Sequence, residues 1–203
     1  MRLGILGGTF NPPHLGHLVS AQEAHLQLGL DRVMLVPARL PPHKPVEDEP
    51  GVEHRLEMCR IAVRGDEARL EVSDIEARRP GPSYTVDTLE ELRATVPDSE
   101  LVLIVGSDVA AGFGSWREPG RVLSLARLEV AARPGTSREE VERALGEVGG
   151  EGRFSFFTMP EIEISSTMLR ERIRRGQPTR YLMPDAVRAY ADAHRLYRGS
   201  PTA

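Results

Sequence analysis

Short apolar runs alternate with longer stretches of helical periodicity along the whole chain. The runs are bounded by Gly, Pro or polar residues, which is typical of buried strands. They lie at 3–6, 33–36, 70–72, 101–105, 128–132 and 154–157. We therefore expect six strands separated by helices.

Between these runs, apolar residues recur at intervals of three and four. Leu15, Leu18, Val19 and Leu26 share one helical face, and Gly29 is expected to end that helix. Further helices are predicted from Val52 to Val63, after an N-cap at Ser83, after Ser137, from a cap at Ser165 or Ser166 to Gly176, and from Pro184 to about Leu196.

This alternation predicts an α/β protein with a doubly wound parallel sheet and helices on both faces. We expect a single domain spanning residues 1–203, with a small C-terminal helical part at about 165–198. In such folds, ligands bind beyond the carboxyl ends of the strands. Four polar segments fall at such ends: the loop after Gly7, the loop around Lys44, Gly106–Asp108, and the Ser165 cap.

Composition narrows the class of protein. The formal net charge of −4 argues against a nucleic-acid partner, because such proteins usually carry a basic excess. No apolar segment is long enough to span a membrane or to form the core of a signal peptide, so we expect a cytoplasmic location. Cys59 is the single cysteine, and its apolar neighbours favour a buried filler over a nucleophile.

The segment from Gly7 to His17 has the features of a phosphate site. Its two leading glycines allow close approach of the backbone to an anion, and the following helix should direct its N-terminal amides to the same place. His14 and His17 lie nearly one helical turn apart, so both can reach one anion. A metal is the alternative ligand for such a pair, although no Cys or carboxylate lies close by as a third ligand.

The match from Gly8 to His17 resembles the T/HxGH signature of the nucleotidyltransferase superfamily. The segment is neither a Walker A motif nor a dinucleotide-binding glycine motif. One departure is Asn11, where many members of the superfamily carry Asp. The resemblance implies a Rossmann-like fold and binding of ATP.

Three further motifs resemble bacterial nicotinate mononucleotide adenylyltransferases. They are Pro41-Pro-His-Lys-Pro45, which holds the only lysine of the chain, Ser83-Tyr-Thr-Val-Asp-Thr-Leu89, and Ile164-Ser-Ser-Thr-Met-Leu-Arg170. Trp116 lies where that family stacks a tryptophan on the pyridine ring. Taken singly, these features have ordinary alternatives. Residues 41–45 could be a Pro-rich surface loop, residues 164–170 a capping segment with a surface arginine, and Trp116 a core residue.

The resemblance implies transfer of the adenylyl group of ATP to nicotinate mononucleotide, with nicotinate adenine dinucleotide and diphosphate as products. The implied catalytic residues are His14, His17 and Lys44. Mg²⁺ would be the cofactor, held mainly by ATP and water rather than by protein ligands. The implied ATP-binding residues are Gly7, Gly8, Thr9, Phe10, His14, His17, Gly106, Asp108, Ser166, Thr167 and Arg170. Lys44, Thr85 and Trp116 would bind the mononucleotide.

Three other functions stay open on the sequence. The acceptor could be nicotinamide mononucleotide or phosphopantetheine, and the chain could be a non-catalytic nucleotide sensor of the same fold. A class I aminoacyl-tRNA synthetase also uses a His-x-Gly-His loop, but this chain lacks a KMSKS-like motif. The predicted partners are therefore ATP and nicotinate mononucleotide, with no nucleic acid and no membrane.

Overall fold

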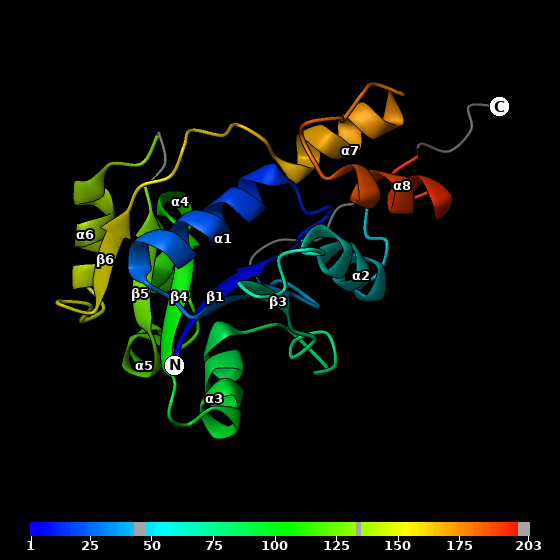
Figure 1. The fold of residues 1–203 in the computed structure, drawn as a ribbon. Coiled ribbons are helices and arrows are strands. Elements are labelled where there is room, and N and C mark those ends of the chain that lie inside the picture. The colour runs from blue at the N-terminus through cyan, green and yellow to red at the C-terminus, as the bar shows by residue number, and fades with distance from the viewer. Residues whose placement is uncertain (43–47, 133–134, 199–203) are drawn as a thin grey trace.

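Six parallel strands form one sheet in the order β3-β2-β1-β4-β5-β6 (Figure 1). The computed structural model describes residues 1–42, 48–132 and 135–198. The strands are β1 Arg2–Gly8, β2 Arg32–Pro37, β3 Leu70–Val72, β4 Glu100–Gly106, β5 Arg127–Ala131 and β6 Phe154–Phe157. The predicted parallel sheet is confirmed, because each neighbouring pair runs in the same direction.

Helices cover both faces of the sheet (Figure 1). One face packs on α3, α5 and α6, through residues that include Val86, Val122 and Val141. The other face packs on α1 and α2, where Ala21 and Cys59 are fully buried. The helices are α1 Leu15–Leu28, α2 Val52–Ala62, α3 Thr85–Thr95, α4 Ser107–Ala111, α5 Pro119–Leu125, α6 Arg138–Gly146, α7 Ser166–Arg174 and α8 Asp185–Ala193, with a short 3₁₀ helix at Phe113–Ser115.

The C-terminal helices α7 and α8 pack together at the outer side of α2 (Figure 1). Leu169, Ile173 and Val187 meet Met58 and Ile61 of α2 in a separate apolar cluster. Burial of these side chains fixes α7 next to the segment that follows β1. The C-terminal helical part therefore contributes directly to the edge of the sheet where the site is expected.

Most predicted helix ends agree with the structure. Gly29 has the left-handed conformation, with φ 59°, just after α1. Ser137 and Ser165 cap α6 and α7 by accepting hydrogen bonds from the amides of Glu140 and Met168. The last helix ends at Ala193, three residues before the predicted Leu196.

The predicted N-cap at Ser83 is wrong. Tyr84 occupies the N-cap of α3, and the Ser83 hydroxyl instead accepts hydrogen bonds from the amides of Arg39 at 2.9 Å and Leu40 at 3.4 Å. Ser83 therefore fastens the segment after β2 to the start of α3.

Cys59 is fully buried in the core, as the sequence predicted. Burial raises the pKa of its thiol. A protonated, inaccessible thiol is a poor nucleophile, so Cys59 serves as core packing. Among the described residues, no helix combines the length and the apolar character needed to cross a membrane.

Candidate active site

The strand order reverses between β1 and β4, and this reversal opens a crevice at the carboxyl edge of the sheet. The chain leaves β1 for α1 on one face and leaves β4 for α4 on the other. Such a switch point is where open α/β sheets bind ligands. The predicted segments at Gly7–Gly8 and Gly106–Asp108 end these two strands, so the structure brings them together.

The two histidines of the first motif stack on each other. Their ring centroids are 3.7 Å apart with an angle of 26° between the planes, and Phe10 contacts the His17 ring at 4.8 Å. A Cβ at Gly16 would lie 3.1 Å from two atoms of the His14 ring. A larger residue between the histidines would therefore have to displace the stacked His14 ring by a few tenths of an ångström.

The orientation of His17 is set by the backbone. The amide of His14 donates to Nδ1 of His17 at 3.2 Å. A nitrogen that accepts a hydrogen bond carries no proton, so the neutral ring has its hydrogen on Nε2. Nε2 is then the atom with which His17 can donate to an anion.

The expected supply of free amides at the start of α1 is partly wrong. The amide of Leu15 donates to the carbonyl of Leu182 at 3.1 Å, and the amides of His17 and Leu18 donate to the carbonyl of His14. The helix packs against the C-terminal part here, which uses the Leu15 donor. The amide of Leu15 is therefore engaged within the protein.

The start of α7 attaches to the loop between β1 and α1. The Ser166 hydroxyl donates to the carbonyl of Pro12 at 2.8 Å, and Nη1 of the buried Arg170 donates to the carbonyl of Asn11 at 3.1 Å. The Tyr197 hydroxyl donates to Oδ1 of Asn11 at 2.7 Å. The side-chain oxygen of Asn11 thus connects this loop to the C-terminal segment.

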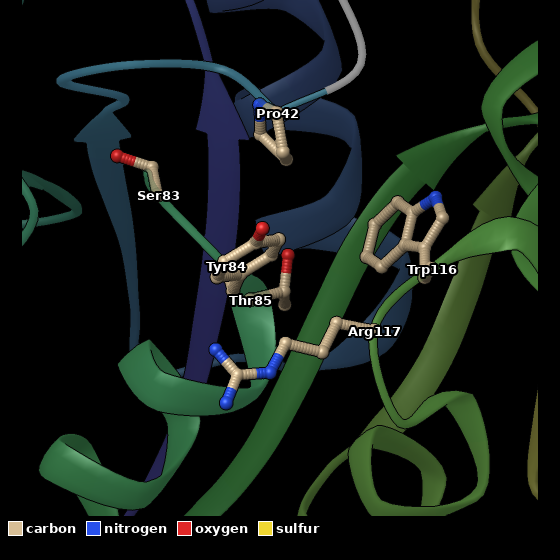
Figure 2. A pocket seen from close by; sticks show the side chains of 6 residues that line it. All are labelled: Pro42, Ser83, Tyr84, Thr85, Trp116 and Arg117. Atoms are coloured by element: carbon tan, nitrogen blue, oxygen red, sulfur yellow. The ribbon is translucent and has the colours of Figure 1, made fainter. Parts of the chain in front are cut away.

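A cleft of about 70 Å³ lies between the start of α3 and the segment after the 3₁₀ helix (Figure 2). Thr85 at the start of α3 and Trp116 after the 3₁₀ helix both line it, so the structure brings these two predicted residues together. The Trp116 ring is half-buried and packs on Phe113, with centroids 4.9 Å apart. The remaining lining residues are Pro42, Ser83, Tyr84 and Arg117, of which Arg117 carries a charge.

A second cavity of about 210 Å³ lies at the carboxyl ends of β4, β5 and β6. Ser107 lines it, next to the exposed Asp108 in the first turn of α4. Its other lining residues are Ala132, Thr136, Arg138, Phe156, Phe157 and Thr158. The mix of aromatic and polar groups suits a flat heterocycle with polar edges.

Comparison with known proteins identifies the family. The model of the cytidylyltransferase-like family matches residues 5–172. A probable nicotinate-nucleotide adenylyltransferase of Roseiflexus sp. strain RS-1 is 46% identical over 97% of this chain and 98% of that protein. The Bacillus subtilis strain 168 nicotinate-nucleotide adenylyltransferase is 39% identical over 97% and 98%, respectively. This chain belongs to the nicotinate-nucleotide adenylyltransferase family.

Solved structures of similar fold agree with this family assignment. A Plasmodium falciparum nicotinic acid mononucleotide adenylyltransferase complexed with NaAD has a TM-score of 0.78 at 18% identity, over 97% of each chain. A putative nicotinate-nucleotide adenylyltransferase from Vibrio parahaemolyticus has a TM-score of 0.66 at 18% identity, over 98% of each chain.

Lys44 lies outside the described residues, so its role in catalysis and in binding the mononucleotide stays a prediction. The roles of Gly7, Gly8, Thr9 and Phe10 in binding ATP also stay predictions. Phe10 is buried in the core and packs against the His17 ring.

Sequence reasoning missed Arg55, whose side chain has no exposed surface. It contacts the segments after β1 and β2. A signal existed, because Arg55 precedes Met58 and Cys59 by three and four residues and therefore shares their apolar helical face. A lone charge on such a face is easily taken for a surface residue.

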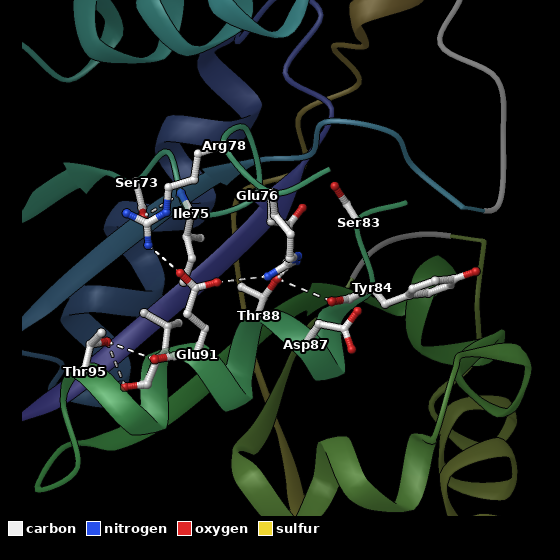
Figure 3. Close-up of polar contacts among 12 residues, drawn as sticks. Ser73, Ile75, Glu76, Arg78, Ser83, Tyr84, Asp87, Thr88, Glu91 and Thr95 are labelled. Atoms are coloured by element: carbon white, nitrogen blue, oxygen red, sulfur yellow. Dashed lines mark hydrogen bonds and ion pairs between the residues drawn. The ribbon is translucent and has the colours of Figure 1, made fainter. Parts of the chain in front are cut away.

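A polar network around Thr88 of α3 adjoins Ser83, one of the residues that line the cleft (Figure 3). Thr88 donates to Glu76 at 2.7 Å and accepts from Nη2 of Arg79 at 2.7 Å, while Glu76 also contacts the Ser83 hydroxyl. Burial raises the pKa of the Glu76 carboxyl above its ordinary value of 4.5, and the hydrogen bonds from Thr88 and Ser83 only partly oppose this shift.

The raised pKa predicts how folding stability depends on pH. A carboxyl that binds its proton more tightly in the folded state contributes full stability below its unfolded pKa and loses it as pH rises through the folded pKa. We expect Glu76→Gln to gain stability relative to the wild type as pH rises from about 4.5, the ordinary value of the group. Urea unfolding across pH 4 to 8 measures the difference. Glu90→Gln, at an exposed carboxylate of α3, controls for net charge. Parallel curves for the wild type and Glu76→Gln would contradict the prediction.

Proposed function

We propose that this protein transfers the adenylyl group of ATP to nicotinate mononucleotide, forming nicotinate adenine dinucleotide and diphosphate. One observation carries the proposal. A stacked histidine pair at the end of β1 lies on the same sheet edge as a cleft lined by Thr85 and Trp116. The first suits phosphates and the second suits a pyridine ring. Relatives of nearly equal length carry the name of this reaction.

The reaction needs no general base. The 5′-phosphate of the mononucleotide is already an anion at neutral pH and can attack the α-phosphorus of ATP directly. The bond to the β-phosphate breaks, and diphosphate leaves with the electron pair. The protein then acts by holding the two substrates in line and by stabilising charge on the transferred group.

The phosphate side of the site is cationic or hydrogen-donating. Nε2 of His17, with His14 stacked against it, would donate to the ATP phosphates. Lys44 would neutralise phosphate between the two substrates. Ser166, Thr167 and Arg170 would face the departing diphosphate, where α7 begins. Phosphate would compete there with the Pro12 carbonyl for the Ser166 hydroxyl and with Asp48 for Arg170.

The ribose and the two bases would occupy the rest of the crevice. Asp108 would accept a hydrogen bond from a ribose hydroxyl of ATP, next to Gly106. Trp116 would stack on the pyridine ring, and Thr85 would bind its carboxylate. Arg117 lines the same cleft, and its guanidinium pairs there with Asp87 at 3.7 Å and Glu118 at 3.6 Å.

Mg²⁺ fits this site as an ion bound to ATP. Among the described residues, no group of three or more His, Cys, Asp or Glu side chains could hold a metal. Imidazole and guanidinium groups gather near the first motif and suit phosphate oxygens, while Mg²⁺ prefers oxygen ligands from phosphates and water. When bound there, the ion would neutralise phosphate charge.

The choice of acceptor is tested by measuring diphosphate release. We expect the purified protein with ATP and Mg²⁺ to release diphosphate on addition of nicotinate mononucleotide, and much more slowly with nicotinamide mononucleotide or phosphopantetheine. The product should have the mass of nicotinate adenine dinucleotide. Faster turnover with either alternative acceptor would replace the proposed substrate, and ATP binding without release with any acceptor would favour a nucleotide sensor.

Replacing His17 tests the phosphate side. His17→Ala removes the donor at Nε2, and the loss of one charge-stabilising donor typically lowers kcat by about 10²–10³. Steady-state kinetics with both substrates measures the effect. His25→Ala, near the other end of the same helix, is the control and should keep normal turnover. Normal turnover in His17→Ala would remove His17 from the mechanism.

Replacing Trp116 tests the nicotinate side. Trp116→Ala removes a ring contact of about 0.5–1.5 kcal/mol plus buried area, so KM for the mononucleotide should rise by roughly tenfold or more. The KM for ATP should stay within a small factor. Tyr181→Ala, at an aromatic residue that is 77% exposed, is the control. A change confined to the KM for ATP would contradict the prediction, because it would place Trp116 at the ATP-binding part of the site.

A further inference from the structure

Arg55 is a fully buried cation that belongs to none of the motifs assigned above. It lies in the first turns of α2 and donates hydrogen bonds to oxygens of three separate segments. Nη1 reaches the carbonyls of Thr9 at 2.8 Å and Ala38 at 2.7 Å, and Nη2 reaches the carbonyl of Arg39 at 3.2 Å. Nε donates to Glu49 at 2.9 Å, which also balances the charge.

The segments that Arg55 joins lead to opposite sides of the crevice. Thr9 opens the loop that carries the stacked histidines. Ala38 and Arg39 follow β2, and the amide of Arg39 continues the connection by donating to the Ser83 hydroxyl at 2.9 Å. Ser83 lines the cleft that contains Trp116. A single guanidinium therefore connects the phosphate loop to a wall of the mononucleotide cleft.

The two segments also have a connection that does not involve Arg55. The amide of Ala38 donates to the carbonyl of Gly8 at 2.9 Å, next to the last paired residues of β1 and β2. Loss of the guanidinium would therefore leave the loops attached and change their spacing. Spacing matters here, because attack requires reacting atoms about 3–3.5 Å apart, and a shift of about 1 Å can cost about 10²-fold in rate.

We propose that Arg55 is a positioning residue that sets the distance between the ATP-binding loop and the mononucleotide cleft. The inference rests on the proposed function in that it takes adenylyl transfer as the reaction. Arg55 contacts no substrate itself. Its planar fork suits this role because it can satisfy several carbonyls in fixed directions, which the single ammonium of lysine does not do.

Arg55→Lys keeps the charge beside Glu49 and loses most of the carbonyl contacts. We expect kcat to fall by about 10- to 100-fold while KM for ATP and for the mononucleotide each change by less than about threefold, because each half-site stays intact. Equilibrium binding of a non-hydrolysable ATP analogue should also be unchanged. This split between kcat and KM is the readout that a role in folding alone would not give.

Arg93→Lys is the matched control. Arg93 also donates to backbone carbonyls, those of Ser99 at 2.8 Å and Leu125, but at the amino edge of the sheet. It should lose stability in urea and keep kcat. Equal kcat losses in both variants, or a normal kcat in Arg55→Lys, would overturn the proposal.

A gentler variant covers the case in which Arg55→Lys does not fold. Glu49 is partly exposed, and Glu49→Gln weakens its hold on Arg55 without opening the core. We expect a smaller fall in kcat than in Arg55→Lys, again with both KM values unchanged. An unchanged kcat in this variant would count against the proposal.

Assaying the wild type first, with each acceptor, separates failure of the proposed function from failure of the role of Arg55. If another acceptor proves active, the same comparison of kcat and KM is made with it.

Discussion

Two neighbouring parallel strands, β1 and β4, send their following segments to opposite faces of the sheet, and the site depends on this divergence. Neither segment can close the gap between the strand ends. The gap is instead bordered by loops, whose carbonyls and amides lack the partners that helices and strands provide for themselves. The crevice is thus a consequence of strand order, and the loops that border it provide the residues of the site.

Side chains supply the missing hydrogen bonds along that edge. Arg55 donates to the carbonyls of Thr9, Ala38 and Arg39, and Arg170 donates to the carbonyl of Asn11. Buried backbone carbonyls need such donors, and a guanidinium offers five N–H groups in one plane. Buried arginines can therefore fix the shape of irregular loops that must stay open to substrate.

The sequence predicted the sheet well because its central strands β1, β2 and β4 contain apolar runs buried on both faces. The edge strands β3 and β6 are short and are each interrupted by one polar residue, Glu71 or Ser155. Short helices were harder. The chain contains α4, of five residues, and α5, which begins with Pro119-Gly120, and neither has enough apolar repeats to give a helical pattern. Ser83 was misplaced because a serine before a helix usually caps it, whereas here its hydroxyl binds a segment more than forty residues away. Long-range partners of this kind are invisible in local patterns.

The candidate site was predictable to the extent that its residues sit in compact motifs. Thr85 and Trp116 meet in one cleft, and the histidines of the first motif stack. The partners of Asn11 and the burial of Arg55 were not predictable, because they depend on segments that only the folded chain brings together. Among the motif residues, Arg170 also turned out to support the loop through Asn11.

The contacts between the first loop and the C-terminal helices have a consequence for the order of folding. Asn11 meets Tyr197 across 186 residues, and Ser166 meets Pro12 across 154. Contacts between residues so distant in sequence form late, because a long loop must close first. During synthesis, the sheet can assemble while the histidine loop still lacks these supports. A chain that fails in its last two helices would therefore be expected to retain a folded core and an unfinished active site.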